Sequence, residues 1–365
     1  MRCLNHRRLV PLAVLASLTI AMTAPAGAAT STAAEQTAET AAAQAVDHKA
    51  LAARALDGYI RPEFDGFETA AARLAAAAED DQSPETLLPL YDAAYDAWMR
   101  VWFFRFGPLE AEGRRFRLEF WPERSGIAYR AISALVRARN PIVDDPDAFA
   151  GASAGAQNLV AMERLLRPRD AVPAAGTDGA GYRHRLIRAM ARNLAREAAA
   201  ARAGWDEEGG AAFLLMTAGA EENMTYFTPD EATFALFNAF HGALQELEEL
   251  RLGAVAADQA STSPRAAHER AGASLENIRA GIGGLIDFER IVFAPAAIDQ
   301  MAQAAMAASL AEAARAADAA IAAGPADIAG IAALKSALAD ARGLAVSRLA
   351  PALGVRVGFN SFDGD

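Results

Sequence analysis

Residues 228–250 read TPDEATFALFNAFHGALQELEEL, and this stretch shows the pattern that decides the fold. Thr228 and Glu231, three residues apart, form a capping box, and Pro229 stands at the first helical position. Apolar residues then recur every three or four positions, which is the spacing of one helix face. The same periodicity runs along almost the whole chain, without the sustained alternation that is typical of strands. The sequence therefore predicts an all-α protein built by packing helices on helices.

The breaks between periodic segments divide the chain into helices. The predicted helices cover residues 33–57, 64–80, 84–105, 126–139, 153–167, 182–206, 211–223, 230–250, 265–290, 297–322 and 327–349. Residues 168–181 are rich in proline, glycine, alanine and aspartate, which is typical of a linker, and 253–264 is a second candidate. We therefore expect two packed helical bundle-like halves, at about 46–170 and 180–360.

The first residues resemble a secretory signal peptide. A start that contains Arg2 and no acid precedes an apolar run over 9–22, and Ala26-Gly27-Ala28 supplies the small-x-small cleavage pattern. The run is shorter than the ~20 residues that a spanning helix needs. We expect cleavage after residue 28, a flexible region over 29–45, and a periplasmic or secreted protein.

Charge and cysteine content argue against a lipid-anchored, a disulfide-linked and a nucleic-acid-binding protein. The sole cysteine, Cys3, precedes the apolar run, so we expect no lipid anchor there and a mature chain without disulfides or thiolate ligands. The net charge of −11 becomes more negative once the arginines of the leader are removed. An acidic protein is a poor general binder of nucleic acid. No later apolar run is long enough to span a membrane.

Three local signals resemble one known family. Residues 59–64 read YIRPEF, residues 104–108 read FRFGP and are followed by FWPER at 120–124, and the end of the chain carries LG at 353–354 and GFNS at 358–361. In these features the chain resembles the imelysin family. The resemblance covers essentially the whole mature chain, over 46–360. It implies two packed helical halves and an association with iron or haem uptake, and the family's name implies a peptidase.

The family's characteristic motif is G-x-H-x-x-E, in which the histidine and glutamate share a helix face and are proposed to bind a metal or act in catalysis. The matching segment here is NLVAME at 158–163. Glu163 keeps the acid, but Asn158 replaces the glycine and Val160 replaces the histidine. Because valine cannot bind a metal or move a proton, the motif does not favour a peptidase. Glu163 is either a binding-site acid or a buried acid paired with an arginine.

Arginines and aromatic residues are concentrated between Arg100 and Arg139, where nine arginines face four glutamates. Guanidinium groups bind carboxylates in bidentate pairs, and aromatic planes add stacking surface. Arg105, Trp121 and Arg124 are therefore candidates to bind an anionic, partly aromatic ligand such as a ferric chelate or haem. The alternative is structural: the arginines pair with acids elsewhere in the chain, and the aromatic residues fill a core.

The histidines show no metal-site spacing. His241 lies on the apolar stripe of the 230–250 helix, which is typical of a hydrogen-bonded core histidine; it and Glu163 are only weak metal candidates. His184 and His268 have mostly polar neighbours, so we expect both to be exposed.

These patterns favour a non-enzymatic exported binding protein, and the resemblance suggests iron or haem acquisition. The expected partners are a ferric chelate, haem or an envelope transport protein, and the sequence itself requires no cofactor. Two alternatives stay open: a metal-dependent peptidase, and a module that binds another envelope protein.

Overall fold

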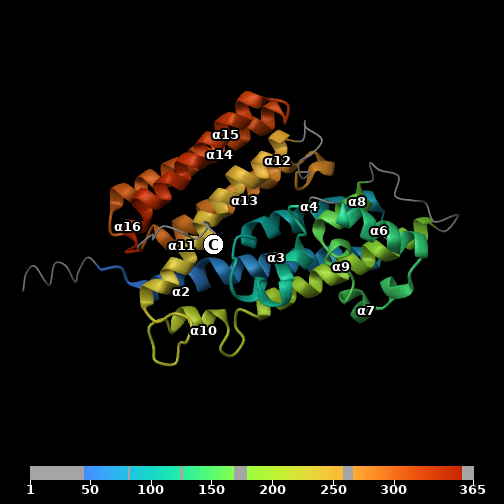
Figure 1. Cartoon of the computed structure of the whole chain (residues 1–365), viewed down its shortest axis with the longest axis horizontal. Coiled ribbons are helices and arrows are strands. Elements are labelled where there is room, and N and C mark those ends of the chain that lie inside the picture. The colour runs from blue at the N-terminus through green and yellow to red at the C-terminus, as the bar shows by residue number, and fades with distance from the viewer. Residues whose placement is uncertain (1–44, 81–82, 124–125, 168–178, 258–265, 356–365) are drawn as a thin grey trace, which may run out of the picture. The chain divides into compact units, whose positions relative to one another are not determined.

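The computed structural model is described for residues 45–80, 83–123, 126–167, 179–257 and 266–355 (Figure 1). The chain divides into two compact units, residues 1–45 and 46–365, and the helices below belong to the second unit. The predicted signal peptide lies outside the described residues, as does the predicted flexible region up to residue 44. Both stay predictions.

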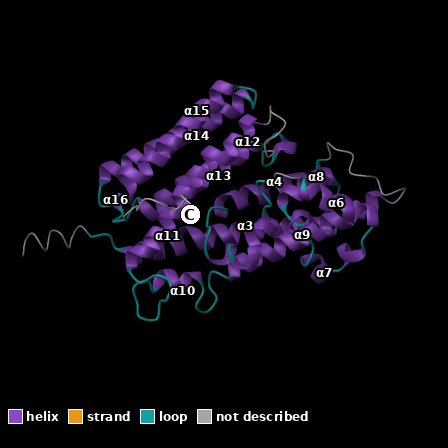
Figure 2. Cartoon of the chain, viewed as in Figure 1, coloured by secondary structure: helices purple, strands orange, loops and turns teal. Residues whose placement is uncertain are grey.

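The described residues form helices, turns and loops, with no strand among them (Figure 2), which confirms the predicted all-α class. The α-helices are α2 (His48–Ala55), α3 (Arg61–Glu79), α4 (Pro84–Val101), α5 (Arg114–Leu118), α6 (Ile127–Ala138), α7 (Pro146–Ala150), α8 (Leu159–Leu166), α9 (Gly179–Ala203), α10 (Ala211–Met216), α11 (Pro229–Gln245), α12 (Leu252–Ala257), α13 (Ser274–Phe288), α14 (Gln300–Ala323), α15 (Ile328–Leu344) and α16 (Ala350–Ala352). The 3-10 turns are η2 (Gly107–Leu109), η3 (Ala111–Gly113), η4 (Pro141–Asp144), η5 (Ala154–Ala156) and η8 (Glu269–Ala271).

Most predicted helices are present, and several were predicted too long, two of them by more than six residues at one end. The helix expected over 211–223 ends at Met216, and residues up to 228 form a loop. The helix expected over 265–290 begins only at Ser274, because residues 266–273 form a turn that contains η8. That turn carries two residues at positive φ, His268 and Gly272, a conformation that a helix cannot contain.

Side chains at the helix starts satisfy the free backbone donors. At α11 the predicted capping box is confirmed, with the Glu231 carboxylate accepting from the N–H of Phe227 and of Thr228. Asn158 caps α8 by accepting from Ala161 N at 2.9 Å. The motif position where the family has glycine is thus occupied here by a residue that fixes the start of the helix.

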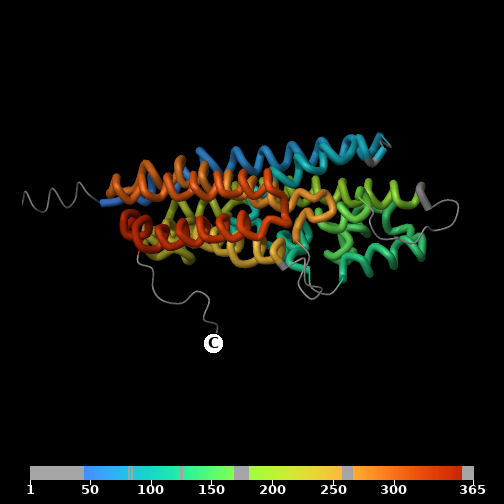
Figure 3. The backbone as a smooth tube through the Cα atoms, turned by 90° about the horizontal axis from the view of Figure 1, so that it is seen from above, coloured from blue at the N-terminus to red at the C-terminus, as the bar shows by residue number. Residues whose placement is uncertain are grey.

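The helices pack in two sets of neighbours. Helix α3 lies along α4 and α9, and α8 contacts α4, α6 and α9. Helix α14 lies beside α15 and α13, as Figures 1 and 3 both show, while α11 contacts α2 and α15. The linker predicted over 168–181 consists largely of residues outside the described part of the chain, and the division into halves stays a prediction.

Helix α4 also packs directly on α13, which joins the two sets. The approach is close because Gly284 faces α4: a Cβ added there would lie 3.2 Å from Arg100 Cα and 3.0 Å from the Tyr59 hydroxyl. That hydroxyl donates to the carbonyl oxygens of both Arg100, 2.8 Å away, and Gly284, 3.0 Å away.

Several long helices continue into π-helical turns, namely η1 (Leu56–Ile60), η7 (Glu246–Arg251), η9 (Glu289–Phe293) and η10 (Ala345–Leu349). A π-turn bonds residue i to i+5, so residues five apart share a face. Single π-turns within α-helices are frequent at functional sites. In the site described next, η7 brings Glu246 and Arg251, five residues apart, to one face of the helix.

Candidate functional site

Helix α4 and the residue that caps its C-terminus present one buried stripe of aromatic residues at helical spacing, Tyr91, Tyr95, Trp98 and the cap Trp102, all fully buried. Their polar atoms need partners because burial removes water. The Tyr91 hydroxyl donates to Leu159 O at 3.0 Å. The Tyr95 hydroxyl and Trp98 Nε1 donate to the two carboxylate oxygens of one acid, Glu119, at 2.7 and 2.8 Å. The stripe therefore connects two polar clusters.

The first cluster, here called the arginine network, consists of Glu119, Glu246, Arg251, Arg105 and Arg115. Arg251 donates to both carboxylate oxygens of Glu119, at 3.0 and 2.7 Å, and its Nε donates to Glu246 at 3.1 Å. These three side chains are at most 4% exposed. A buried bidentate pair of this kind is strong only when all its charges are satisfied, and here they are.

The π-turn η7 produces this geometry. Glu246 and Arg251 are five residues apart and lie on one face of η7, where an ordinary α-helical turn would separate them. The Arg251 guanidinium also lies 4.7 Å from the ring centroids of both Trp102 and Trp121. Burial lowers the pKa of Arg251, but Glu119 and Glu246 outweigh it and raise that pKa. Burial raises the pKa of Glu119, and Arg251 then holds it below its usual value.

Arg105 lies at the outer edge of the network. It pairs with Glu246, the same acid that Arg115 Nη2 contacts at 3.1 Å. Burial, opposed by Glu246, lowers the pKa of Arg105. A cavity of about 190 Å³ opens beside it, and its other lining residues are Gly242, Gln245, Glu246, Glu249 and Leu250. The cavity thus contains more acidic than basic groups.

The arginines of the 100–139 region largely follow the structural interpretation. Arg100 binds Glu63 and Asp287, while Arg114 and Arg117 both bind Glu197. Two of the candidate ligand residues, Arg105 and Trp121, are brought together through Glu246 and Arg251. The third, Arg124, lies outside the described residues. The ligand role of all three stays a prediction.

The second cluster, here called the motif cluster, consists of Glu163, Asp92, Arg167 and His268. Glu163 on α8 is 3% exposed and accepts a hydrogen bond from the N–H of Ala271 at 2.9 Å. Burial raises the pKa of Glu163, and the charges of His268, Arg167 and Arg270 oppose that rise. The motif acid therefore fastens the 266–273 turn to α8, and the arginine beside it, Arg167, pairs with Asp92 rather than with Glu163.

His268 is buried, contrary to the prediction from sequence, and His184, also expected to be exposed, is half-buried. The His268 side chain is 3% exposed, and its Nε2 lies 3.1 Å from Asp92 Oδ1. Its ring packs on the rings of Tyr91 and Tyr95, with centroids 5.6 and 4.7 Å away. Polar neighbours in sequence gave no sign of this burial, because the turn is covered by helices from elsewhere in the chain.

Neither Val160, at the motif's histidine position, nor His241, the other weak metal candidate, completes a metal site with Glu163 in the described part of the chain. Val160 is half-buried against the core. His241 on α11 stacks on Phe237 at 6.0 Å, and burial, together with Arg342, lowers its pKa. In the part of the chain that the structure describes, no group of three His, Cys, Asp or Glu side chains is arranged to hold a metal ion. Because Glu163 already accepts from Ala271 and Val160 has no lone pair, these residues do not fit the motif's metal.

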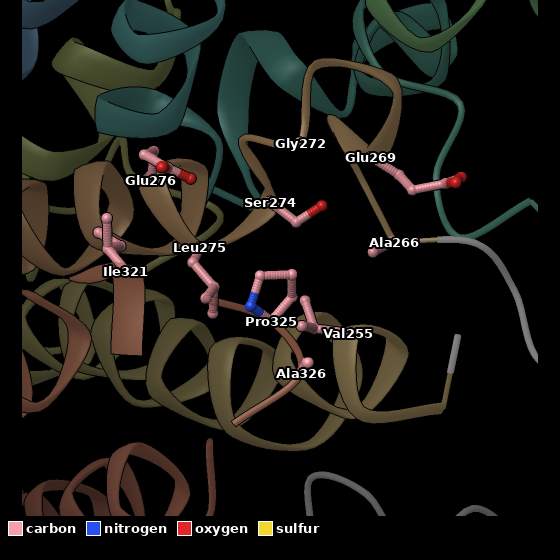
Figure 4. A pocket seen from close by; sticks show the side chains of 10 residues that line it. All are labelled: Val255, Ala266, Glu269, Gly272, Ser274, Leu275, Glu276, Ile321, Pro325 and Ala326. Carbon is pink, nitrogen blue, oxygen red and sulfur yellow. The ribbon is translucent and has the colours of Figure 1, made fainter. Parts of the chain in front are cut away.

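A second cavity, of about 380 Å³, is lined in part by Ala266, Glu269 and Gly272 of the turn that Glu163 holds (Figure 4). Its polar lining groups are Glu269, Ser274 and Glu276, and its apolar lining comes from Val255, Leu275, Ile321, Pro325 and other small residues. Among the described helices, none combines the length and apolar character that crossing a membrane requires.

Comparison with known proteins adds three findings. The family model for imelysin, which carries a peptidase family name, matches residues 60–352. A crystal structure of an imelysin-like protein from Psychrobacter arcticum is similar, with a TM-score of 0.70 and 19% identity, over 86% of this chain and 99% of that one. A structure provisionally named as an iron-regulated protein A precursor, from Parabacteroides distasonis, has a TM-score of 0.65 and 13% identity, over 83% and 95%. A search of curated proteins finds no match.

Proposed function

The chain belongs to the imelysin family, and from that premise we propose that it is an exported, non-enzymatic binding protein of the cell envelope that acts in iron or haem acquisition. Fold alone does not assign this role, because one fold hosts many functions. The proposal rests on the motif cluster, in which Glu163 holds a backbone turn and the ligands that a catalytic metal needs are not assembled.

The observation that carries the proposal is the use made of Glu163. Its buried carboxylate accepts from the backbone of Ala271, and the position one turn before it is Val160. A metal-dependent hydrolase needs several ligands and an open position for water. An acid that holds a turn lining a cavity suits a protein that binds a ligand. The iron-regulated name of one structural relative suggests which class of ligand to test.

The second candidate is an interaction module for another envelope protein. Met224 and Phe227, in the loop before α11, are 77% and 66% exposed. Large apolar side chains exposed together favour a protein contact. Loss of binding to a captured envelope protein after Met224→Ser and Phe227→Ser would favour this candidate over a small-molecule role.

The test uses the full chain, exported in a bacterial host and purified from the envelope fraction. N-terminal sequencing of the product would show cleavage after residue 28. Iron and haem are measured by elemental analysis and by absorbance, and both are then titrated into the empty protein. The proposal predicts saturable binding of an iron species and no cleavage of unfolded casein.

Two outcomes would overturn it. Casein cleavage that a chelator abolishes would restore the peptidase. Binding of neither iron nor haem would leave the interaction module as the better account.

A further inference from the structure

The loop between α10 and α11, residues 217–228, projects from the helices beside α10 (Figure 1). It turns two large apolar side chains toward solvent: Met224 is 77% exposed and Phe227 is 66% exposed, whereas Tyr226 packs against the core. Burying a side chain of this size stabilises a fold by about 1.5–3 kcal/mol, so this loop forgoes stability. Single exposed apolar residues are ordinary, but large ones gathered in one place mark an interaction surface.

The loop is held in one conformation by a buried asparagine, Asn223, which is 1% exposed. Its Nδ2 donates to Leu214 O at 2.7 Å and Thr217 Oγ1 at 3.0 Å, and its Oδ1 accepts from the N–H groups of Thr225 at 3.0 Å and Tyr226 at 2.8 Å. The N–H of Gly219 donates to Tyr226 O at 3.0 Å and closes the loop. These bonds fix the backbone that carries Met224 and Phe227. A surface that is fixed before binding loses less conformational entropy when a partner docks.

The charge around this pair is acidic. Residues 203–231 contain seven acids and no lysine or arginine. Glu221 and Glu222 lie in the loop itself and are exposed, as is Asp230 in the first turn of α11. Helix α2, which α10 contacts, adds one exposed lysine, Lys49, so the acids remain in excess.

These charges distinguish between the occupants that an apolar surface can have. An anionic lipid surface attracts basic segments and repels acidic ones. A second copy that presented the same loop would bring Glu221 and Glu222 against their equivalents, and like charges that face each other cost several kcal/mol. A different protein with an apolar recess flanked by lysine or arginine matches both the apolar pair and the acids around it.

We propose that the 217–228 loop is a docking surface for a basic protein partner, with Met224 and Phe227 as its apolar anchors. A few central side chains carry most of the binding energy of an interface, while charges at its rim set the association rate and the salt dependence. Glu221 and Glu222 have the second role here. The proposal deepens the interaction module given above as the second candidate function and rests on it, but it does not depend on iron.

The experiment titrates an amphipathic helical peptide of leucine and lysine into the purified full chain by calorimetry. This peptide should bind, and a leucine–glutamate peptide of the same pattern should not. Met224→Ser and Phe227→Ser should each weaken binding about 10- to 100-fold, as expected for an anchor residue. Glu222→Gln should weaken it less and reduce its salt dependence. Met301→Ser is the matched control, because Met301 in α14 is 79% exposed outside the loop, and it should bind as the wild type does.

Urea unfolding should be the same for all these variants, because every substituted side chain is exposed. Absence of peptide binding, or binding that both serine variants retain, would overturn the surface. Phosphatidylglycerol vesicles that bind the wild type but not Phe227→Ser would assign the loop to a membrane instead. Self-association that Phe227→Ser abolishes would assign it to a second copy of the chain. Binding of iron without the peptide would sink the surface and leave the iron role, and binding of the peptide without any iron species would support the surface and sink the iron role.

Discussion

Glu246 and Arg251 lie five residues apart on the same face of η7, with Arg251 Nε 3.1 Å from Glu246 Oε1. Because of the π-turn, one helix supplies both the carboxylate of Glu246 and the guanidinium of Arg251. Glu119, from a different segment, is the second carboxylate that binds this guanidinium. Few rules of helix pairing anticipate this contact, because they concern residues three and four apart.

Removal of Arg251 should therefore be costly. Arg251→Met would leave Glu119 and Glu246 buried without their shared partner, and we expect a loss of about 3–5 kcal/mol in the free energy of unfolding. Urea denaturation measures it. Arg315→Met, which breaks the exposed pair with Glu312, is the control and should cost less than about 1 kcal/mol. Equal effects of the two substitutions would contradict a stabilising network.

Glu163 should act through its oxygen as an acceptor rather than through its charge. Glu163→Gln keeps an oxygen that can accept from Ala271 N, so we expect little change in stability. Glu163→Ala leaves that N–H without its partner and should cost about 1–3 kcal/mol. Hydrogen exchange of the Ala271 amide should quicken in the alanine variant alone. Similar exchange in both variants would show that the acid does not hold the turn.

Stability should depend on pH through Glu289. Burial raises the pKa of this acid, which is 2% exposed, to about 7. The folded protein then keeps the proton that the unfolded chain loses near pH 4.5, so this contribution is complete below 4.5 and is lost as pH rises to about 7. We expect the free energy of unfolding to fall by roughly 2–3 kcal/mol across that window. Glu289→Gln should flatten the profile, and a profile unchanged by the substitution would refute the assignment.

Metal removal should leave the fold intact. Since Glu163 and Val160 do not form a metal site, dialysis against a chelator should change the thermal midpoint by less than about 1 °C. Differential scanning calorimetry before and after dialysis checks this. A fall of several degrees that added zinc or iron reverses would mean that a metal is bound and would reopen the peptidase alternative.

The sequence predicted the helical class and most helix positions because apolar periodicity and capping residues are local signals. The capping box at Thr228 is an example, since all its atoms lie within one turn. Helix ends were less predictable where a turn resembles a helix in composition, as over 266–273, where positive φ angles interrupt the pattern.

The candidate site could be predicted only in part. Glu163 stood out through the motif, and Arg105 and Trp121 through composition. The partners of all three come from distant segments: Ala271 for Glu163, Glu246 for Arg105, and Arg251 for Trp121. No local pattern encodes such contacts, and His268 was misplaced for the same reason.

The position of Tyr95 constrains which substitutions this protein can accept in evolution. Its hydroxyl binds Glu119 in the arginine network, while its ring packs against His268 in the motif cluster. A substitution at 268 that repacks the ring also moves the donor on which a buried acid depends. Positions 95, 119 and 268 should therefore vary together among the relatives of this chain, and substitutions in the two clusters should be coupled.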